Sequence, residues 1–165
     1  MTFIPGYTIL VIDTNILLSS LSIVISLIES QKWTIVIPLP VIMELDGLSL
    51  NTEVPHLRDA AQIAMSYISS HIRSHSLSLK VQTSKGNYLS SLAVRTEEVD
   101  FDSGDGKKFA PKSMDDLILK AAIWQDDHWV KRSSLLKVTS PTSGEVQNGT
   151  KVVLLTLDRN CMSDM

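Results

Sequence analysis

Short, almost continuous runs of apolar residues are the feature that most constrains the fold of this chain. Residues 7–12, 33–37 and 152–156 are rich in Val, Ile and Leu and are too short for helices of ordinary length. Such runs are typical of strands that are buried on both faces of a parallel sheet. Residues 77–81 alternate between apolar and polar side chains, which predicts a further strand.

Segments with a helical spacing of apolar residues lie between these runs. They span residues 16–30, 41–48, 56–74 and 114–125, and the first could consist of two short helices. Pro40 suits the first turn of the second segment, Gly47 is a candidate for its end, and Ser113 is a good N-cap for the last. The alternation predicts an α/β fold in which helices cover both faces of a central parallel sheet.

The composition is that of one folded domain. The chain has 165 residues, 44% of them hydrophobic, so residues 1–165 are expected to form a single domain. The one cysteine, Cys161, excludes a disulfide framework and a cysteine-rich zinc site, and it favours a reducing compartment. No apolar run approaches the roughly 18 residues of a membrane span, and no signal peptide is visible. We therefore expect a cytoplasmic protein without a membrane partner, with the nucleus as a second location.

Acidic residues stand where the expected strands and helices meet. Asp13 and Asp158 follow the first and last strands, while Glu44 and the pair Asp115–Asp116 lie near the starts of two helices. Sites of open parallel sheets lie beyond the carboxyl ends of the strands, so these acids could converge there. Clustered carboxylates suit Mg²⁺ or Mn²⁺, and two such ions can activate water for phosphodiester hydrolysis. A single acid after a strand more often caps a turn or a helix, so the interpretation depends on the joint placement.

Two histidines are candidates for a further metal site. His71 and His75 are four residues apart, a spacing that puts both on one face of a helix. No cysteine or glutamate lies at a suitable spacing nearby, so we interpret them as ordinary, partly exposed histidines. A glycine-rich phosphate-binding loop is also absent from the sequence, which argues against an NTPase or a dinucleotide-binding enzyme.

The ordered set of acidic motifs resembles the PIN domains, a family of metal-dependent nucleases with a three-layer α/β/α fold. The resemblance is carried by residues 11–15, 37–48, 115–119 and 154–160, in the order of the family. Residues 44–48 and 83–95 look most similar to the Smg-type PIN domain, the endonuclease of nonsense-mediated mRNA decay that is also known as a telomerase-binding Est-like protein. Swt-type nuclear endonucleases share the Glu-Leu-Asp block at residues 44–46 and are the competing assignment.

The resemblance implies an endoribonuclease that cleaves single-stranded RNA in mRNA decay or surveillance, with Mg²⁺ or Mn²⁺ as its cofactor. The implied catalytic and metal-binding acids are Asp13, Glu44, Asp115 and Asp158, with Asp116 as a further metal-ligand candidate. The residues implied to orient these carboxylates are Thr14, Asn15 and Thr156. The family usually continues with a helix and an edge strand after the position of Asp158, and we expect both to be missing here.

Basic residues in the second half of the chain are candidates for RNA contact. Residues 107–137 contain seven Lys or Arg side chains against four acids, a balance that suits a phosphate backbone. The expected contacts are Lys85, Lys107, Lys108 and Lys112, and a solvated loop surface is an equally good interpretation for each alone. Other domains of a larger parent protein and mRNA decay factors are the implied protein partners. The alternative function is a catalytically silent PIN module that binds RNA or protein.

Overall fold

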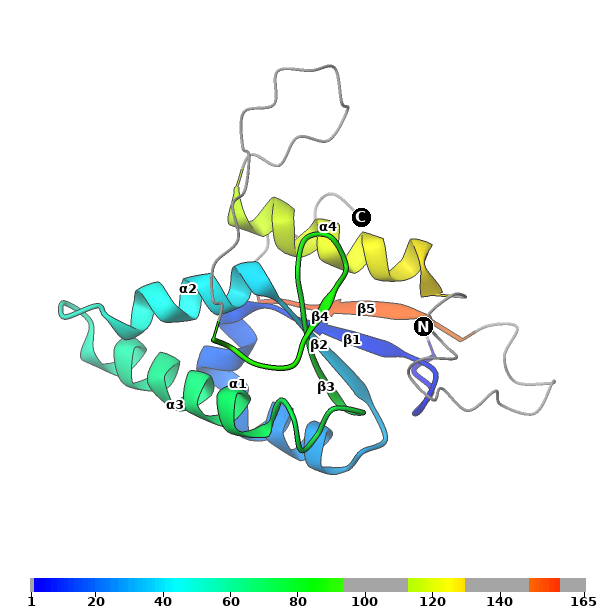
Figure 1. The fold of residues 1–165 in the computed structure, drawn as a ribbon, viewed down its shortest axis with the longest axis horizontal. Coiled ribbons are helices and arrows are strands. Elements are labelled where there is room, and N and C mark those ends of the chain that lie inside the picture. Colours follow the sequence, from blue (N-terminus) through cyan, green and yellow to red (C-terminus); the bar gives the residue numbers. More distant parts are fainter. Residues whose placement is uncertain (1, 94–112, 130–148, 158–165) are drawn as a thin grey trace, which may run out of the picture.

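The computed structural model of the chain describes residues 2–93, 113–129 and 149–157, which form a sheet flanked by helices (Figure 1). Its strands are β1 (Ile9–Ile12), β2 (Thr34–Pro38), β3 (Leu79–Gln82), β4 (Tyr88–Leu89) and β5 (Val152–Leu155). Its helices are α1 (Thr14–Glu29), α2 (Leu39–Ser49), α3 (Pro55–His71) and α4 (Met114–Asp127). Strands and helices therefore alternate along most of the described chain, as the sequence predicts.

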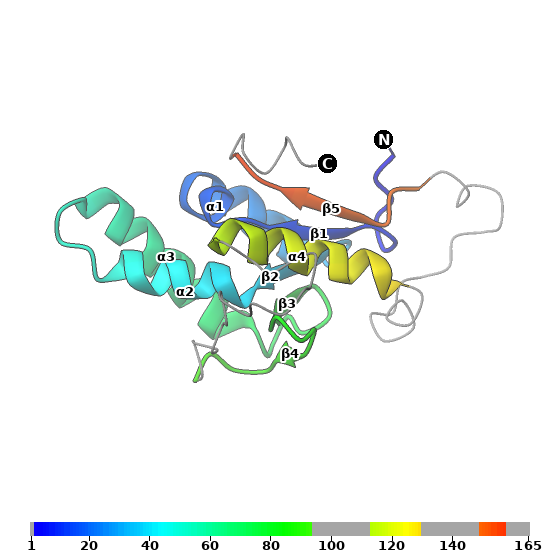
Figure 2. The same cartoon turned by 90° about the horizontal axis from the view of Figure 1, so that it is seen from above.

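The strand order in the sheet is β4-β3-β2-β1-β5, which Figure 2 shows from above. β1 pairs in parallel with both β2 and β5, so that Val11 lies between Val36 and Leu154. β2 pairs in parallel with β3. The expected parallel sheet is confirmed for these four strands. Their carboxyl ends consequently share one edge of the sheet, here called the carboxyl edge, and their amino ends share the opposite, amino edge.

The edge strand β4 departs from the expectation, because it pairs with β3 in the antiparallel direction. A tight turn reverses the chain between them, and the Gly86 amide donates a hydrogen bond of 2.9 Å to the Thr83 carbonyl oxygen. Gly86 has φ +82°, and a Cβ atom there would lie 2.2 Å from the Trp124 ring of α4. Only glycine fits both this backbone conformation and the close approach of the indole.

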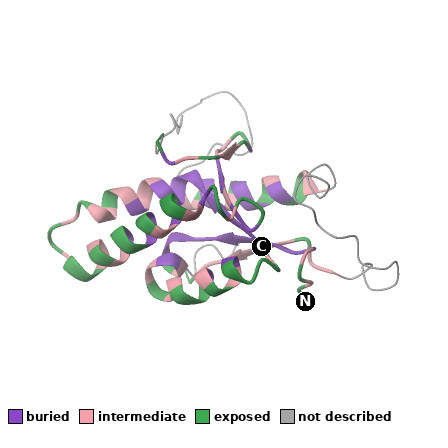
Figure 3. Cartoon of the chain, turned by 60° about the horizontal axis from the view of Figure 1, so that its bottom comes forward, coloured by how far each residue is buried: buried purple, intermediate pink, exposed green. Residues whose placement is uncertain are grey.

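Alternate residues of the central strands face two different layers. Ile9, Val11 and Val36 pack with Ala122 of α4. The residues of opposite parity belong to the larger core formed with α1, α2 and α3; they are Leu10, Ile12, Ile35 and Ile37. Figure 1 shows α4 above the sheet and α1 and α3 below it, and Figure 3 shows the central strands buried between them. This is the three-layer α/β/α fold that the sequence analysis expects.

Local sequence signals set where the helices begin. Asp13 caps α1, and a kink at Ser20 divides this helix into the two short pieces that its sequence suggests. α2 carries Pro40 in its first turn, but it continues through Gly47 to Ser49, so the expected stop at Gly47 is wrong. Glycine is tolerated at this exposed position inside a helix, at a modest cost.

The starts of three helices frame the carboxyl edge. α1 and α2 follow β1 and β2 directly, so their first turns lie at this edge. α4 begins with a capping box, in which the Ser113 side chain accepts from the Asp116 amide and the Asp116 side chain accepts from the Ser113 amide. Within the described ranges, no helix combines the length and the apolarity needed to span a membrane.

Candidate active site

Asp13 is the most firmly held acid at the carboxyl edge. It follows β1 directly, it caps α1, and only 3% of its surface is exposed. Its Oδ1 atom accepts a hydrogen bond from the Thr14 amide at 2.6 Å, and its Oδ2 atom accepts one from the Thr156 hydroxyl at 2.6 Å. Each carboxylate oxygen keeps a second lone pair. The group is therefore fixed in position and still able to bind a cation.

Glu44 of α2 lies beside the start of α1. The buried Thr14 hydroxyl donates a hydrogen bond to its Oε2 atom. Burial raises the pKa of the Glu44 carboxyl above its ordinary value, and the Thr14 hydrogen bond acts in the opposite direction. The negative charges of Asp115 and Asp13 raise this pKa further. Three acids from separate parts of the chain thus share one electrostatic environment, and we call them the carboxyl-edge acids: Asp13, Glu44 and Asp115.

The two neighbouring acids at the start of α4 have different surroundings. Asp115 is partly buried, and its charge acts on Glu44. Asp116 is exposed, and its Oδ2 atom accepts a hydrogen bond of 3.2 Å from the Ser113 amide within the capping box. A helix cap was the competing interpretation for every acid in the set. For Asp116 that interpretation rests on an observed contact, and its role as a metal ligand stays a prediction.

The other sequence candidates fall into two groups. Thr156 contacts Asp13, whereas Asn15 is exposed and uses its backbone carbonyl oxygen to accept a hydrogen bond of 2.7 Å from Ser19. Lys85 is exposed in the turn between β3 and β4. Outside the described residues lie Asp158, Lys107, Lys108 and Lys112, and their roles stay predictions.

A surface hollow of about 590 Å³ lies beside the start of α1. It is lined by Asn15, Leu18, Ser19, His56, Leu57 and Leu157. Asn15 follows Thr14, which holds Glu44, and Leu157 follows Thr156, which holds Asp13. Two lining residues are therefore chain neighbours of the two threonines that hold the acids. The leucine side chains give the hollow an apolar surface near the carboxyl edge.

The donor set at this edge fits a hard divalent cation. Carboxylate and hydroxyl oxygens are the ligands that Mg²⁺ and Mn²⁺ prefer. In the described part of the chain, neither Asp13 nor Glu44 forms an ion pair with a basic side chain. Among the described residues, no three carboxylates have oxygens that all lie within 4.8 Å of one another. Mg²⁺ keeps several water ligands and is often bound by only one or two carboxylates, which this spacing allows.

The structure also brings together three potential metal ligands that the sequence does not predict to lie close to one another. Glu29 lies beside His71 and His75, at the opposite edge of the sheet. Glu29 and His75 are 46 residues apart in the chain, so no local spacing could have joined them. The local signal in the sequence is the four-residue spacing of His71 and His75, which by itself is also typical of ordinary, partly exposed histidines.

Comparison with known proteins assigns the family. A family model described as PIN domain matches residues 10–163, which is most of the chain. The chain therefore belongs to the PIN domain family. It is also 29% identical over 161 residues to the telomerase-binding protein EST1A of Danio rerio, and the match covers 92% of this chain and 10% of that protein. The chain spans about a tenth of the length of this relative, whose similarity confirms the resemblance to the Smg-type, Est-like PIN domains.

Proposed function

We propose that this chain is a divalent-metal-dependent endoribonuclease that cleaves single-stranded RNA by hydrolysis. Membership of the PIN family supports a nuclease-type or RNA-related module. The observation that carries the finer proposal is the placement of Asp13, Glu44 and Asp115 at one edge: burial first, and then the charges of Asp115 and Asp13, raise the pKa of the Glu44 carboxyl. Like charges held this close are costly unless a cation compensates them. A metal ion is the simplest group that would do so and would also serve hydrolysis.

The side chains at the carboxyl edge would contribute to binding that ion in different ways. Asp13 and Asp115 would bind it, Glu44 would act from the rim, and Asp158 and Asp116 are further candidates. Mg²⁺ or Mn²⁺ bound there would supply the Lewis acidity that attack of water on a phosphodiester requires. The Thr14 amide and the Thr156 hydroxyl keep Asp13 from turning away, and the Thr14 hydroxyl orients Glu44.

RNA would approach this edge over basic and apolar surface. Lys85, Lys107, Lys108 and Lys112 are the proposed phosphate contacts. The hollow beside Asn15 and Leu157 offers apolar surface for a nucleotide next to the acids. If lysines contact phosphates, neutralising Lys107, Lys108 and Lys112 together weakens RNA binding and makes its salt dependence shallower, because fewer counterions are released. An unchanged affinity and salt slope would remove that surface from the proposal.

The cellular setting is proposed from the relative alone. Since the chain matches about a tenth of a much longer protein, we propose that it works beside other domains of a parent protein and with mRNA decay factors. The proposed process is mRNA decay or surveillance, in the cytoplasm and in the nucleus. The telomerase-binding role belongs to the Danio rerio protein by its name, and nothing in the site described above requires it of this chain.

The test is cleavage of an unstructured, end-labelled RNA by the purified chain in Mn²⁺ or Mg²⁺. Internal cleavage should leave a 5′-phosphate and a 3′-hydroxyl, and a chelator should stop it. Asp115→Asn should slow the reaction by about 100-fold or more, since losing even a group that only supports a metal ligand costs about 10- to 100-fold. Asp127→Asn is the matched control, because Asp127 is an exposed acid at the other end of the same helix.

A catalytically silent module is the competing function. It is favoured by the spacing of the described carboxylates, because no three of them have oxygens that all lie within 4.8 Å of one another. RNA binding without cleavage in either metal would support that module. Cleavage that persists in excess chelator and leaves a 2′,3′-cyclic phosphate would point to a contaminating ribonuclease instead.

A further inference from the structure

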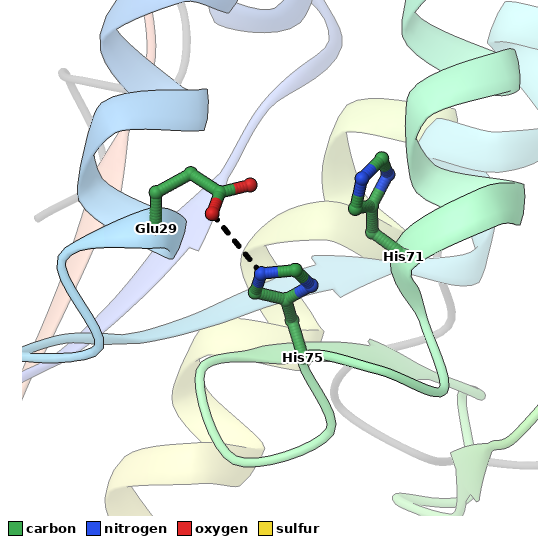
Figure 4. Close-up of side chains that lie close together, drawn as sticks. All are labelled: Glu29, His71 and His75. Atoms are coloured by element: carbon green, nitrogen blue, oxygen red, sulfur yellow. Dashed lines mark hydrogen bonds and ion pairs between the residues drawn. The ribbon is translucent and has the colours of Figure 1, made fainter.

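Glu29, His71 and His75 form a compact group at the amino edge of the sheet, here called the amino-edge cluster (Figure 4). Glu29 ends α1, His71 ends α3, and His75 lies in the turns before β3. One carboxylate oxygen and one ring nitrogen from each histidine all lie within 4.8 Å of one another. The 16 residues of α1 separate this cluster from Asp13 by about 24 Å, so the two groups cannot share an ion.

The two histidines keep a helical relationship although α3 ends between them. The His75 amide donates a hydrogen bond of 2.9 Å to the His71 carbonyl oxygen, as in a continuing turn of helix. Their ring centroids are 5.2 Å apart. Histidines at this spacing present two neighbouring nitrogen ligands from one face. Glu29 reaches the same point from the other helix, with its Oε2 atom 3.1 Å from His75 Nε2.

Each of the three side chains is also held by a contact on its far side. His71 Nδ1 lies 2.8 Å from the Tyr67 carbonyl oxygen, to which it donates when neutral, so its Nε2 lone pair is free. His75 Nδ1 lies 2.9 Å from the Ser74 hydroxyl. The Tyr67 hydroxyl donates a hydrogen bond of 2.8 Å to Glu29 Oε1, which leaves Oε2 directed at the histidines. Histidines that bind metals almost always have such a partner on the other ring nitrogen.

We propose that Glu29, His71 and His75 bind a Zn²⁺ ion. Two imidazoles and one carboxylate suit zinc, whereas Mg²⁺ and Ca²⁺ select oxygen ligands. Ligand atoms about 2.0–2.1 Å from a tetrahedral zinc ion lie about 3.4 Å from one another. The Glu29–His75 distance of 3.1 Å is already close to this value, and the His71 nitrogen, which lies within 4.8 Å of both ligand atoms, would move closer to join them. Water or a ligand from another molecule would take the fourth position.

The consequence of the ion would be structural, since it joins the ends of α1 and α3. The cluster is open to solvent, with 16% of the His75 side chain and 48% of the Glu29 side chain exposed, so an ion can enter without opening the core. In the unfolded chain these ligands come from distant positions and do not form a site. Zinc would therefore bind the folded state selectively and stabilise it by mass action.

The test is a calorimetric titration of the 165-residue chain with Zn²⁺. Excess Mg²⁺ keeps the carboxyl-edge acids occupied, and Cys161→Ser removes the competing thiol. One ion per chain should bind, and free zinc at about 100 times Kd should raise Tm by about 5–10 °C. His71→Gln and His75→Gln should each raise Kd by about tenfold or more. His56→Gln should leave Kd unchanged, because His56 is an exposed histidine at the other end of α3.

Each outcome decides for or against the site. Zinc binding that is unaffected by His71→Gln and His75→Gln overturns the proposal, and so does a parent chain that binds no zinc. Loss of zinc binding in Asp115→Asn would assign the ion to the carboxyl edge and overturn it as well. Circular dichroism and the metal-free Tm establish that each variant folds. As a second measurement, Co²⁺ should give the visible absorption of a four-coordinate ion, and the same two histidine variants should abolish it.

Discussion

The two ends of α1 each carry an acid, and the two acids are held in opposite ways. Asp13 precedes the helix at the carboxyl edge, where it is 3% exposed and accepts hydrogen bonds from an amide and a hydroxyl. Glu29 ends the helix at the amino edge, where it is largely exposed and pairs with His75 at 3.1 Å. The first acid is fixed by neutral donors among other acids, and the second is compensated by a group that can carry positive charge.

The two edges therefore differ in how far the carboxylate charges are compensated without a bound ion. At the carboxyl edge, neutral donors hold the carboxylates in place but do not compensate their charges. Burial is the main cause of the raised pKa of Glu44, and the charges of Asp115 and Asp13 raise it further. At the amino edge, the tyrosine and histidine contacts lower the pKa of Glu29, so the charge is already accommodated. A hard cation therefore has the most to offset at the carboxyl edge, whereas the amino edge presents nitrogen ligands that a softer ion prefers.

The largest effect on stability is expected from removing the cap at Asp13. Asp13→Ala loses the hydrogen bonds that Asp13 accepts from the Thr14 amide and from the Thr156 hydroxyl, at a cost of about 2 kcal/mol. For a domain of this size that lowers Tm by about 4–8 °C. Asp13→Asn keeps a capping oxygen and removes a repelling charge, so its metal-free Tm should equal or exceed that of the parent. Thermal unfolding in chelator measures both, and an Asn variant as unstable as the Ala variant would contradict the repulsion.

A smaller effect is expected from Thr14→Val, which keeps the shape of the side chain and removes one hydroxyl. Glu44 then loses the Thr14 hydrogen bond that lowers its pKa, and the fold loses about 1–2 kcal/mol. If Thr14 orients Glu44 for catalysis, RNA cleavage should also fall by about 10- to 100-fold. Ser26→Ala is the control, because its exposed hydroxyl donates to the Ser22 carbonyl oxygen within α1 and lies outside the hollow beside the acids. Normal cleavage by Thr14→Val would leave Thr14 with a structural role alone.

Features that depend on residues close together in the chain could be predicted from the sequence, whereas features that depend on distant residues could not. The buried strands are local patterns, and a parallel sheet brings the ends of its strands to one edge, so the neighbourhood of Asp13, Glu44 and Asp115 could be anticipated. The different surroundings of Asp115 and Asp116 could not be predicted in this way. They depend on the capping box between Ser113 and Asp116, whose residue types can be recognised in the sequence but whose hydrogen bonds cannot. β4 was missed because two residues carry no periodicity, and its pairing is set by the turn at Gly86.

The amino-edge cluster illustrates the opposite case. The spacing of His71 and His75 was visible in the sequence, but the third ligand comes from α1, 46 residues before His75. Glu29 lies beside the histidines because α1 and α3 pack side by side on the same face of the sheet. Packing of that kind depends on many weak contacts between helix surfaces, and no motif in the chain encodes it.

A change of pH should separate the effects of the two glutamates on stability. The pKa of Glu44 is raised in the folded state, so the folded chain is penalised above that pKa and the penalty is absent below the unfolded value of 4.5. Glu44→Gln should therefore raise the metal-free Tm at pH 7, and the gain should disappear as the pH falls to about 4. Glu53→Gln is a control, since Glu53 is exposed just beyond α2. Added Mn²⁺ should reverse the order at pH 7, because it stabilises the parent more. A gain that is independent of pH would mean that the charge of Glu44 is not its cause.

The smallest effect is expected from Glu29→Gln, measured in chelator so that no ion bridges the cluster. The Tyr67 hydrogen bond is the main cause of the lowered pKa of Glu29, with the His75 contact next among the causes that lower it. A lowered pKa gives stability above the unfolded value of 4.5 that is lost as the pH falls further. Because the side chain is exposed, Tm at pH 7 should fall by only about 1–2 °C, and this difference should vanish in acid. Tyr67→Phe should reproduce the loss by removing the same bond. A fall as large as that of Asp13→Ala would mean that the ion pair holds α1 as firmly as its cap does, and the contrast between the two ends of the helix would not stand.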